Sequence, residues 1–113
     1  MSEIQVQHDQ NITLVVGVAS QERDQILAEQ VASSFQGGSP LFILDIKGTL
    51  VPLLLERGVP FAAVASLEEV PSVGAFLVIN DGEGYLKLVT TPELDISPKR
   101  VIASVDALRV DAL

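Results

Sequence analysis

The chain has 113 residues, of which 48% are apolar and 19% are charged, and this balance favours a packed core over disorder. Seven basic and 15 acidic residues give a formal net charge of −8, which disfavours binding to DNA or RNA. The absence of cysteine excludes disulfides and thiolate chemistry. One histidine cannot build a histidine-based metal cluster, so we expect no metal and no cofactor. No apolar run reaches the roughly 18 residues of a membrane span, so we expect a cytoplasmic protein without a membrane partner.

We predict one α/β domain over residues 1–113. Residues 1–10 are mostly polar and form either a flexible leader or an edge strand. Residues 12–16 (ITLVV) are a continuous aliphatic run, which is typical of a central strand that is apolar on both faces. Ser20 then offers an N-cap for an amphipathic helix, and the glycine pair at 37–38 ends that helix.

The same strand-then-helix pattern returns twice farther along the chain. Residues 41–46 (LFILDI) predict a second strand, and Thr49 caps a short helix that Gly58 ends. Residues 61–65 (FAAVA) predict a third strand. A capping box at 66–69 then starts a single helical turn.

The pattern changes in the last third of the chain. Residues 75–79 (AFLVI) predict a strong strand, and a turn at 80–84 connects it to another strand at 85–90, so we expect an antiparallel hairpin. The dipeptide at 97–98, serine then proline, has the form of a helix start. Four apolar residues follow at helical spacing and predict a final helix: Val101, Ile102, Val105 and Leu108.

Strands that alternate with helices pair in parallel through right-handed crossovers. The predicted fold is therefore an α/β three-layer sandwich with a mostly parallel sheet of four or five strands and an antiparallel hairpin at one edge, in the order β-α-β-α-β-(α)-β-β-α. In such sheets ligands bind at the carboxyl ends of the strands. We assign no catalytic residue, and the candidate ligand-binding residues are those that follow the strands: Gly17, Ser20, Arg23, Asp45, Lys47 and Asp81.

Residues 12 to about 65 resemble the nucleotide-binding core of the motor ATPases of the HerA, FtsK and conjugative-coupling type. In that family a strand and a phosphate-binding loop lead into a helix, and the second strand ends in an aspartate-x-lysine-glycine segment, which residues 45–48 (DIKG) match. The resemblance implies that Gly17 is the first glycine of the phosphate-binding loop. Residues 76–81 likewise resemble the aliphatic strand whose terminal acid holds Mg²⁺ in such enzymes.

The loop departs from the family pattern at its remaining positions. Glu22 replaces the second glycine, Arg23 replaces the lysine, and Asp24 replaces the hydroxyl residue that holds Mg²⁺. Each contact of these carboxylates with a phosphate costs about 4 kcal/mol at about 4 Å and an effective dielectric near 20. We therefore expect no ATP hydrolysis, and two interpretations remain: an ordinary strand-to-helix turn capped by Ser20, or a decayed phosphate-binding loop retained as a scaffold.

The acids at the other strand ends also have two interpretations each. Asp45, with Lys47 and Gly48, either orients a ligand or a metal at the sheet edge, or accepts backbone N–H bonds from the next turn while Lys47 is solvated. Asp81 either holds a metal or belongs to a hairpin turn. A hydrolase site that uses both carboxylates is a further hypothesis, for which the sequence does not supply the separation.

Two functions follow from these patterns. The first is a non-catalytic interaction or assembly module, which binds another protein or forms a homodimer through the hairpin edge or the final helix. The alternative is a small-ligand-binding or weakly catalytic protein that uses the strand ends around Gly17, Asp45 and Asp81. An RNA-binding α/β/α domain, suggested by residues 53–65, is disfavoured by the negative charge.

Overall fold

The computed structural model describes residues 4–9, 11–18, 20–35, 40–45, 47–71, 73–80, 86–88, 90 and 96–105. The elements follow in chain order: β1 (Gln5–Asp9), β2 (Ile12–Val16), α1 (Gln21–Ser34), β3 (Leu41–Leu44), α2 (Val51–Glu56), β4 (Ala62–Val64), the 3-10 helix η1 (Leu67–Glu69), β5 (Phe76–Ile79) and β6 (Arg100–Val105). Residues 86–88 and 90 are also helical.

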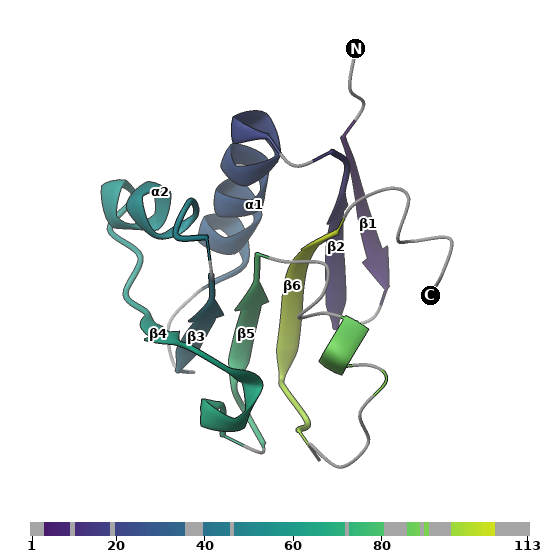
Figure 1. Ribbon diagram of the computed structural model, residues 1–113, viewed down its shortest axis with the longest axis vertical. Helices are drawn as coiled ribbons and strands as arrows, with labels where there is room; N and C mark the ends of the chain where they lie inside the picture. Colours follow the sequence, from purple (N-terminus) through teal and green to yellow (C-terminus); the bar gives the residue numbers. More distant parts are fainter. Residues whose placement is uncertain are drawn as a thin grey trace.

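The strands form one sheet in the order β1-β2-β6-β5-β3-β4 (Figure 1). β1 and β2 are antiparallel, while the other neighbouring strands in this sheet pair in parallel. The predicted α/β class with a mostly parallel sheet and an antiparallel edge is confirmed, although the described sheet has six strands and not the predicted four or five. Residues 5–9 form the edge strand of that sheet, which was one of the two interpretations of the N-terminal segment.

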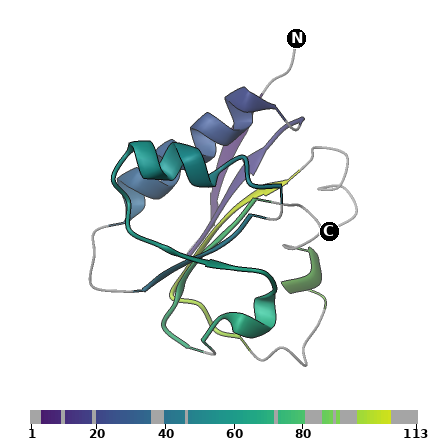
Figure 2. The same ribbon diagram turned by 60° about the vertical axis from the view of Figure 1, so that its left-hand side comes forward.

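Both faces of the sheet are covered, so the fold has three layers. α1 and α2 lie on one face, and η1 and the helical residues 86–88 lie on the other (Figure 2). This arrangement explains why β5 is apolar and buried along its whole length. The core on the α1 side consists of Val15, Leu27, Ala28, Val31, Leu41, Ile43, Leu50, Leu54, Phe76, Val78 and Ile102. The core on the η1 side consists of Val16, Leu44, Leu67, Val70, Ala75, Leu77, Ile79, Val101, Ala103 and Val105.

The helix α1 buries one face against the sheet because its apolar residues recur at helical spacing. Leu27, Ala28 and Val31 are fully buried, and α1 contacts β2, β6 and α2. The predicted N-cap is confirmed, since Ser20 Oγ accepts a hydrogen bond from the Arg23 backbone N–H at 3.1 Å. Among the helices that the structure describes, none is long and apolar enough to span a membrane.

The N-terminus of α2 is stabilised by a side chain outside the helix. The predicted cap Thr49 is wrong: the N-cap residue is Leu50, whose side chain cannot accept a hydrogen bond. Asp45 takes this role, because its Oδ2 accepts from the backbone N–H groups of Leu50 at 2.9 Å and Val51 at 3.0 Å. Gly58 ends the helix as predicted, with a φ of 69° that favours glycine.

The predicted hairpin of residues 75–79 and 85–90 is wrong. β5 lies between β3 and β6 and pairs with both, so it has no free edge for a hairpin partner. Residues 86–88 and 90 are helical instead, and the Thr90 hydroxyl donates to the Leu86 carbonyl oxygen at 2.7 Å. The antiparallel edge of the sheet is the β1-β2 pair. β5 is apolar on both faces, and a strand of this kind belongs at the centre of a sheet and not at its edge.

The predicted final helix is also wrong in the part of it that the structure describes. Residues 100–105 form β6, which lies between β2 and β5 and is buried except at its first residue. A strand that is covered on both faces is apolar at nearly every position. Some of its apolar residues are therefore three or four positions apart, which is also the spacing of the apolar face of a helix. Two further predictions, the glycine pair at 37–38 and Leu108, lie outside the described residues.

Candidate functional site

Three parallel strands bring their carboxyl ends together at one edge of the sheet. β2 ends before Gly17, β3 before Asp45 and β5 before Asn80. The helices that follow β2 and β3 lie on one face, whereas the helical segment that follows β5 lies on the other (Figure 2). The neighbours β3 and β5 therefore connect to opposite faces, and open α/β sheets bind ligands in a crevice of this kind.

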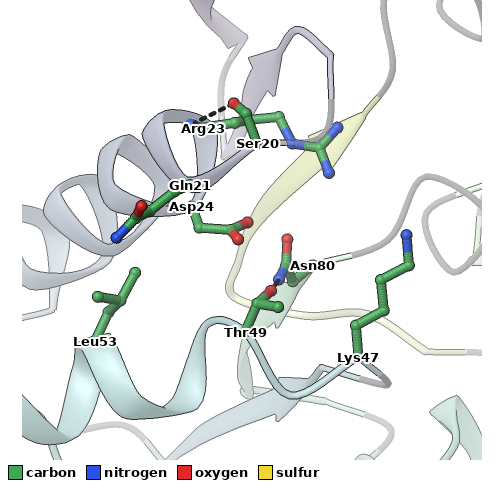
Figure 3. A pocket seen from close by; sticks show the side chains of 8 residues that line it. All are labelled: Ser20, Gln21, Arg23, Asp24, Lys47, Thr49, Leu53 and Asn80. Atoms are coloured by element: carbon green, nitrogen blue, oxygen red, sulfur yellow. Dashed lines mark hydrogen bonds between the residues drawn. The ribbon is translucent and has the colours of Figure 1, made fainter.

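A cavity of about 430 Å³ opens at this edge, beside the first turns of α1 and α2 (Figure 3). Its volume lies in the range of small-molecule binding sites. Seven of its eight lining residues are polar or charged, although carbon atoms contribute most of the lining surface. The lining consists of Ser20, Gln21, Arg23, Asp24, Lys47, Thr49, Leu53 and Asn80.

A hydrogen-bond network centred on Asn80 forms one wall of the cavity. Asn80 is 4% exposed, and its Nδ2 donates to Asp45 Oδ1 and to Thr49 Oγ1, both at 2.9 Å. Its Oδ1 accepts from the Ser104 hydroxyl of β6 at 2.7 Å, and its backbone N–H donates to the Leu44 carbonyl oxygen at 2.9 Å. Because both polar atoms of the side chain have protein partners, Asn80 fixes three strand ends relative to one another.

Asp45 belongs to the same network and has a structural role. One carboxylate oxygen accepts from Asn80, and the other accepts two backbone N–H groups at the start of α2. The interpretation that Asp45 accepts backbone N–H bonds from the next turn is confirmed. Its carboxylate therefore sets the position of α2 beside the cavity.

Arg23 is buried at the start of α1, where it is 7% exposed. Its Nη1 donates to the Gly17 carbonyl oxygen at 3.0 Å, which joins the helix to the end of β2. Its Nε has no hydrogen-bond partner, and in Figure 3 the guanidinium lies at the upper side of the cavity that Arg23 lines. The one ion pair among the described residues joins Lys87 to Glu68 at 3.6 Å, so no carboxylate there neutralises Arg23.

Asp24 and Lys47 are the two charged groups of the cavity wall that have no hydrogen-bond or ion-pair partner in the described part of the chain. Asp24 is 9% exposed, and its carboxylate points into the cavity toward Thr49 and Asn80 (Figure 3). Lys47 is exposed, and its ammonium lies on the other side of Asn80. Most of the Asp24 residue is buried while its carboxylate opens on the cavity, so the molecules that occupy the cavity must supply the donors for this charge.

The structure gathers most of the predicted site residues at this cavity. Five of the six candidates line it or bond to residues that line it: Gly17, Ser20, Arg23, Asp45 and Lys47. Asp81 lies outside the described residues, so its metal, hairpin-turn and two-carboxylate interpretations stay predictions.

Sequence reasoning missed Asp24 and Asn80 as constituents of a binding site. The sequence held a signal for both. Asp24 precedes Leu27, Ala28 and Val31 by three, four and seven residues, so the helical phase places it on the buried face of α1. Asn80 directly follows a strand that is apolar on both faces, where a polar side chain needs internal partners.

The cavity has no donor set for a metal within the described residues, since no three His, Asp or Glu side chains gather there or elsewhere in a suitable arrangement. Comparison of the chain with protein-family models, with curated proteins and with solved structures finds no match. The case for a function therefore depends on the geometry and charge of the cavity.

Proposed function

We propose that this chain is a small-ligand-binding protein whose ligand occupies the cavity beside α1 and α2. The observation that carries the proposal is Asp24, a residue that is nine-tenths buried and whose carboxylate points into the cavity without a partner among the described residues. Buried polar groups in proteins nearly always have hydrogen-bond partners, and the exceptions need an explanation. A ligand that directs a donor group at Asp24 supplies that partner.

The surroundings of Asp24 support binding because they are fixed before a ligand arrives. Ser20 caps α1, Asp45 caps α2, and Asn80 joins the strand ends between the two helices. A site whose walls are already ordered loses less conformational entropy when it binds. Leu53 adds an apolar surface on the α2 side, so the cavity combines a few polar groups with one apolar contact.

Two features of the cavity argue against a nucleotide as the ligand. Phosphate oxygens that enter it would approach the Asp24 carboxylate, at about 4 kcal/mol for each contact near 4 Å. The Arg23 guanidinium, which stands in the lysine position of the family pattern, already donates Nη1 to the Gly17 carbonyl oxygen, which leaves it fewer donors for a phosphate. The resemblance to the motor ATPases stays a prediction about the scaffold, and we propose no ATP hydrolysis here.

A thermal-shift panel of amines, amino acids, sugars, nucleotides, phosphorylated metabolites and divalent cations tests the proposal. We expect at least one small molecule to raise the unfolding temperature, because a ligand at a hundredfold excess over its Kd stabilises the folded state by about 2.7 kcal/mol. The Asp24→Asn variant should lose most of that shift.

Glu22→Gln is the matched control, since it removes the same charge from an exposed position two residues away on α1. It should keep the full ligand-induced shift. Circular dichroism establishes that both variants are folded. A panel in which no compound stabilises the protein, or in which the shift survives Asp24→Asn, contradicts small-ligand binding in this cavity.

Self-association is the second candidate function, and the free edge of β4 favours it. The hairpin edge and the final helix, predicted as contact surfaces, are not available because β5 and β6 lie inside the sheet. β4 pairs only with β3 within the described sheet, and edge strands of this kind accept a further strand. Beside its first residue lies an apolar hollow of about 330 Å³, formed by Phe35, Pro40, Leu41, Phe42, Pro60, Phe61 and Ala62.

Size-exclusion chromatography with light scattering, at micromolar protein, tests this second candidate. We expect a dimer that Ala63→Lys dissociates, because a lysine on an edge strand opposes pairing with another strand. A strict monomer at all concentrations would exclude self-association through β4.

A further inference from the structure

The two unpartnered charges of the cavity have opposite signs and lie on different walls. Asp24 projects from α1, whereas Lys47 belongs to the segment between β3 and α2. In Figure 3 the side chain of Asn80 lies between their charged groups. No ion pair joins them, so neither charge neutralises the other. A molecule in the cavity meets a negative group on one side and a positive group on the other.

We infer that the ligand is a small organic zwitterion, whose cationic nitrogen binds the Asp24 carboxylate and whose anionic group binds the Lys47 ammonium. This inference rests on the proposed function and names the ligand class for the same cavity. A molecule with a single charge leaves one of the two groups without a partner. A divalent cation satisfies Asp24 alone, and a phosphate satisfies Lys47 alone and is repelled by Asp24.

The two contacts differ in strength because the two groups differ in burial. The Asp24 residue is 9% exposed, so a bond between its carboxylate and a ligand cation is less screened by solvent than a contact at the exposed Lys47. Lys47 is exposed, and contacts between exposed charges contribute little. The cationic end of the ligand therefore supplies most of the affinity, and the anionic end supplies selectivity at the mouth of the cavity.

Thr49 adds a neutral donor between the two charges. Its Oγ1 accepts from Asn80 Nδ2, so the hydrogen of the hydroxyl remains to donate. Asn80 itself offers little to a ligand, because its amide group already bonds to Asp45, Thr49 and Ser104. The groups that face a ligand thus include the Asp24 carboxylate as acceptor, the Thr49 hydroxyl as neutral donor and the Lys47 ammonium as exposed cation. Arg23 also lines the cavity, but its guanidinium already donates to the Gly17 carbonyl oxygen.

Nuclear magnetic resonance titrations of the full chain with a series of ω-amino acids, from glycine to 6-aminohexanoate, test the inference. Each compound is compared with the straight-chain amine and the straight-chain carboxylate of the same length. We expect one length to bind at least about tenfold more tightly than the straight-chain carboxylate, which lacks the contact with Asp24, and a few-fold more tightly than the straight-chain amine, which lacks the contact with Lys47. Asp24→Asn should lower the affinity for the best zwitterion by about tenfold to a hundredfold, as for loss of a hydrogen bond to a charged group.

Lys47→Met should lower that affinity by only a few-fold while removing the preference over the amine. Glu22→Gln and Arg57→Gln, which remove one exposed charge of each sign, should leave both affinities unchanged. If the matched amine binds as tightly as the zwitterion and depends on Asp24, the zwitterion class is wrong while the proposed function stands. If neither this series nor the thermal-shift panel contains a compound whose binding depends on Asp24, the proposed function fails as well.

Discussion

The substitution Asn80→Asp tests the network that holds the cavity wall. It keeps the shape and volume of the side chain but replaces the Nδ2 donor, 2.9 Å from Asp45 Oδ1, by an oxygen that carries negative charge. The hydrogen bond between the two side chains becomes a repulsion between two carboxylates. Because both groups are held by the strand ends β3 and β5, they cannot move apart without disturbing the sheet.

The cost follows from this geometry. The charge of each carboxylate is shared by its two oxygens, so the centres of charge lie about 4 Å apart, and an effective dielectric near 20 gives a repulsion of about 4 kcal/mol. Single domains are stable by about 5–15 kcal/mol. We therefore expect Asn80→Asp to remove a large part of the stability at pH 7.

Urea unfolding at pH 7 and at pH 5 measures this effect. Lower pH protonates one carboxylate of the pair and removes the repulsion, so the folded variant binds more protons than its unfolded state and its deficit should shrink as the pH falls. Gln25→Glu adds the same charge at an exposed position of α1 that makes no side-chain hydrogen bond with the described residues, and should change stability by no more than about 0.5 kcal/mol. An Asn80→Asp deficit below about 1 kcal/mol at pH 7, or one that is equal at both pH values, would refute the reasoning.

Three further predictions concern stability and titration. Ser104→Ala leaves the buried Oδ1 of Asn80 without its donor and should lower the unfolding free energy by about 1–3 kcal/mol in urea. Leu27→Ala opens a cavity beneath α1 and should cost about 2–5 kcal/mol in the same assay. A hydrogen bond with Ser66 and the charge of Lys87 lower the pKa of Glu68, so Lys87→Met should raise that pKa in a nuclear magnetic resonance titration, and an unchanged value would contradict the contact.

The first half of the fold was predictable because its signals agree with one another. Residues 12–16 form a strand, Ser20 caps the helix that follows, and Gly58 ends the next helix, as the sequence indicates. Each of these signals is local: an aliphatic run, a capping hydroxyl, or a glycine at positive φ. Local signals predict the structure correctly when tertiary packing favours the same conformation.

The strands at 62–64 and 76–79 and the capped turn at 67–69 also form as predicted. The predictions beyond residue 84 are wrong where the structure describes them, because several conformations fit the same residues. The run at 100–105 has both helical spacing and β-branched residues, and only its place between β2 and β5 decides for a strand. Residues 85–90 alternate over too short a length to distinguish a strand from a helical turn. Their conformation depends on β5, whose two edges are already occupied by other strands.

The position of the candidate site was predictable, whereas its chemistry was not. The rule that ligands bind at the carboxyl ends of strands led to Gly17, Asp45 and Lys47, and the structure places these residues at or against one cavity. The sequence does not reveal which polar groups at that edge satisfy one another. That pairing depends on side chains from β3, β5 and β6, which are distant in the chain.

The hydrogen bonds between side chains divide the polar residues at the carboxyl ends of the strands into two sets with different roles. Asp45, Asn80 and Ser104 satisfy one another or the backbone, so they fix the ends of the strands and the start of α2. Asp24 and Lys47 have no partner among the described residues and face the space that the first set holds open. Substitutions in the first set should therefore change stability, and substitutions in the second should change binding while the protein remains folded. Two assays on the same variants separate the structural residues from the ligand-binding ones.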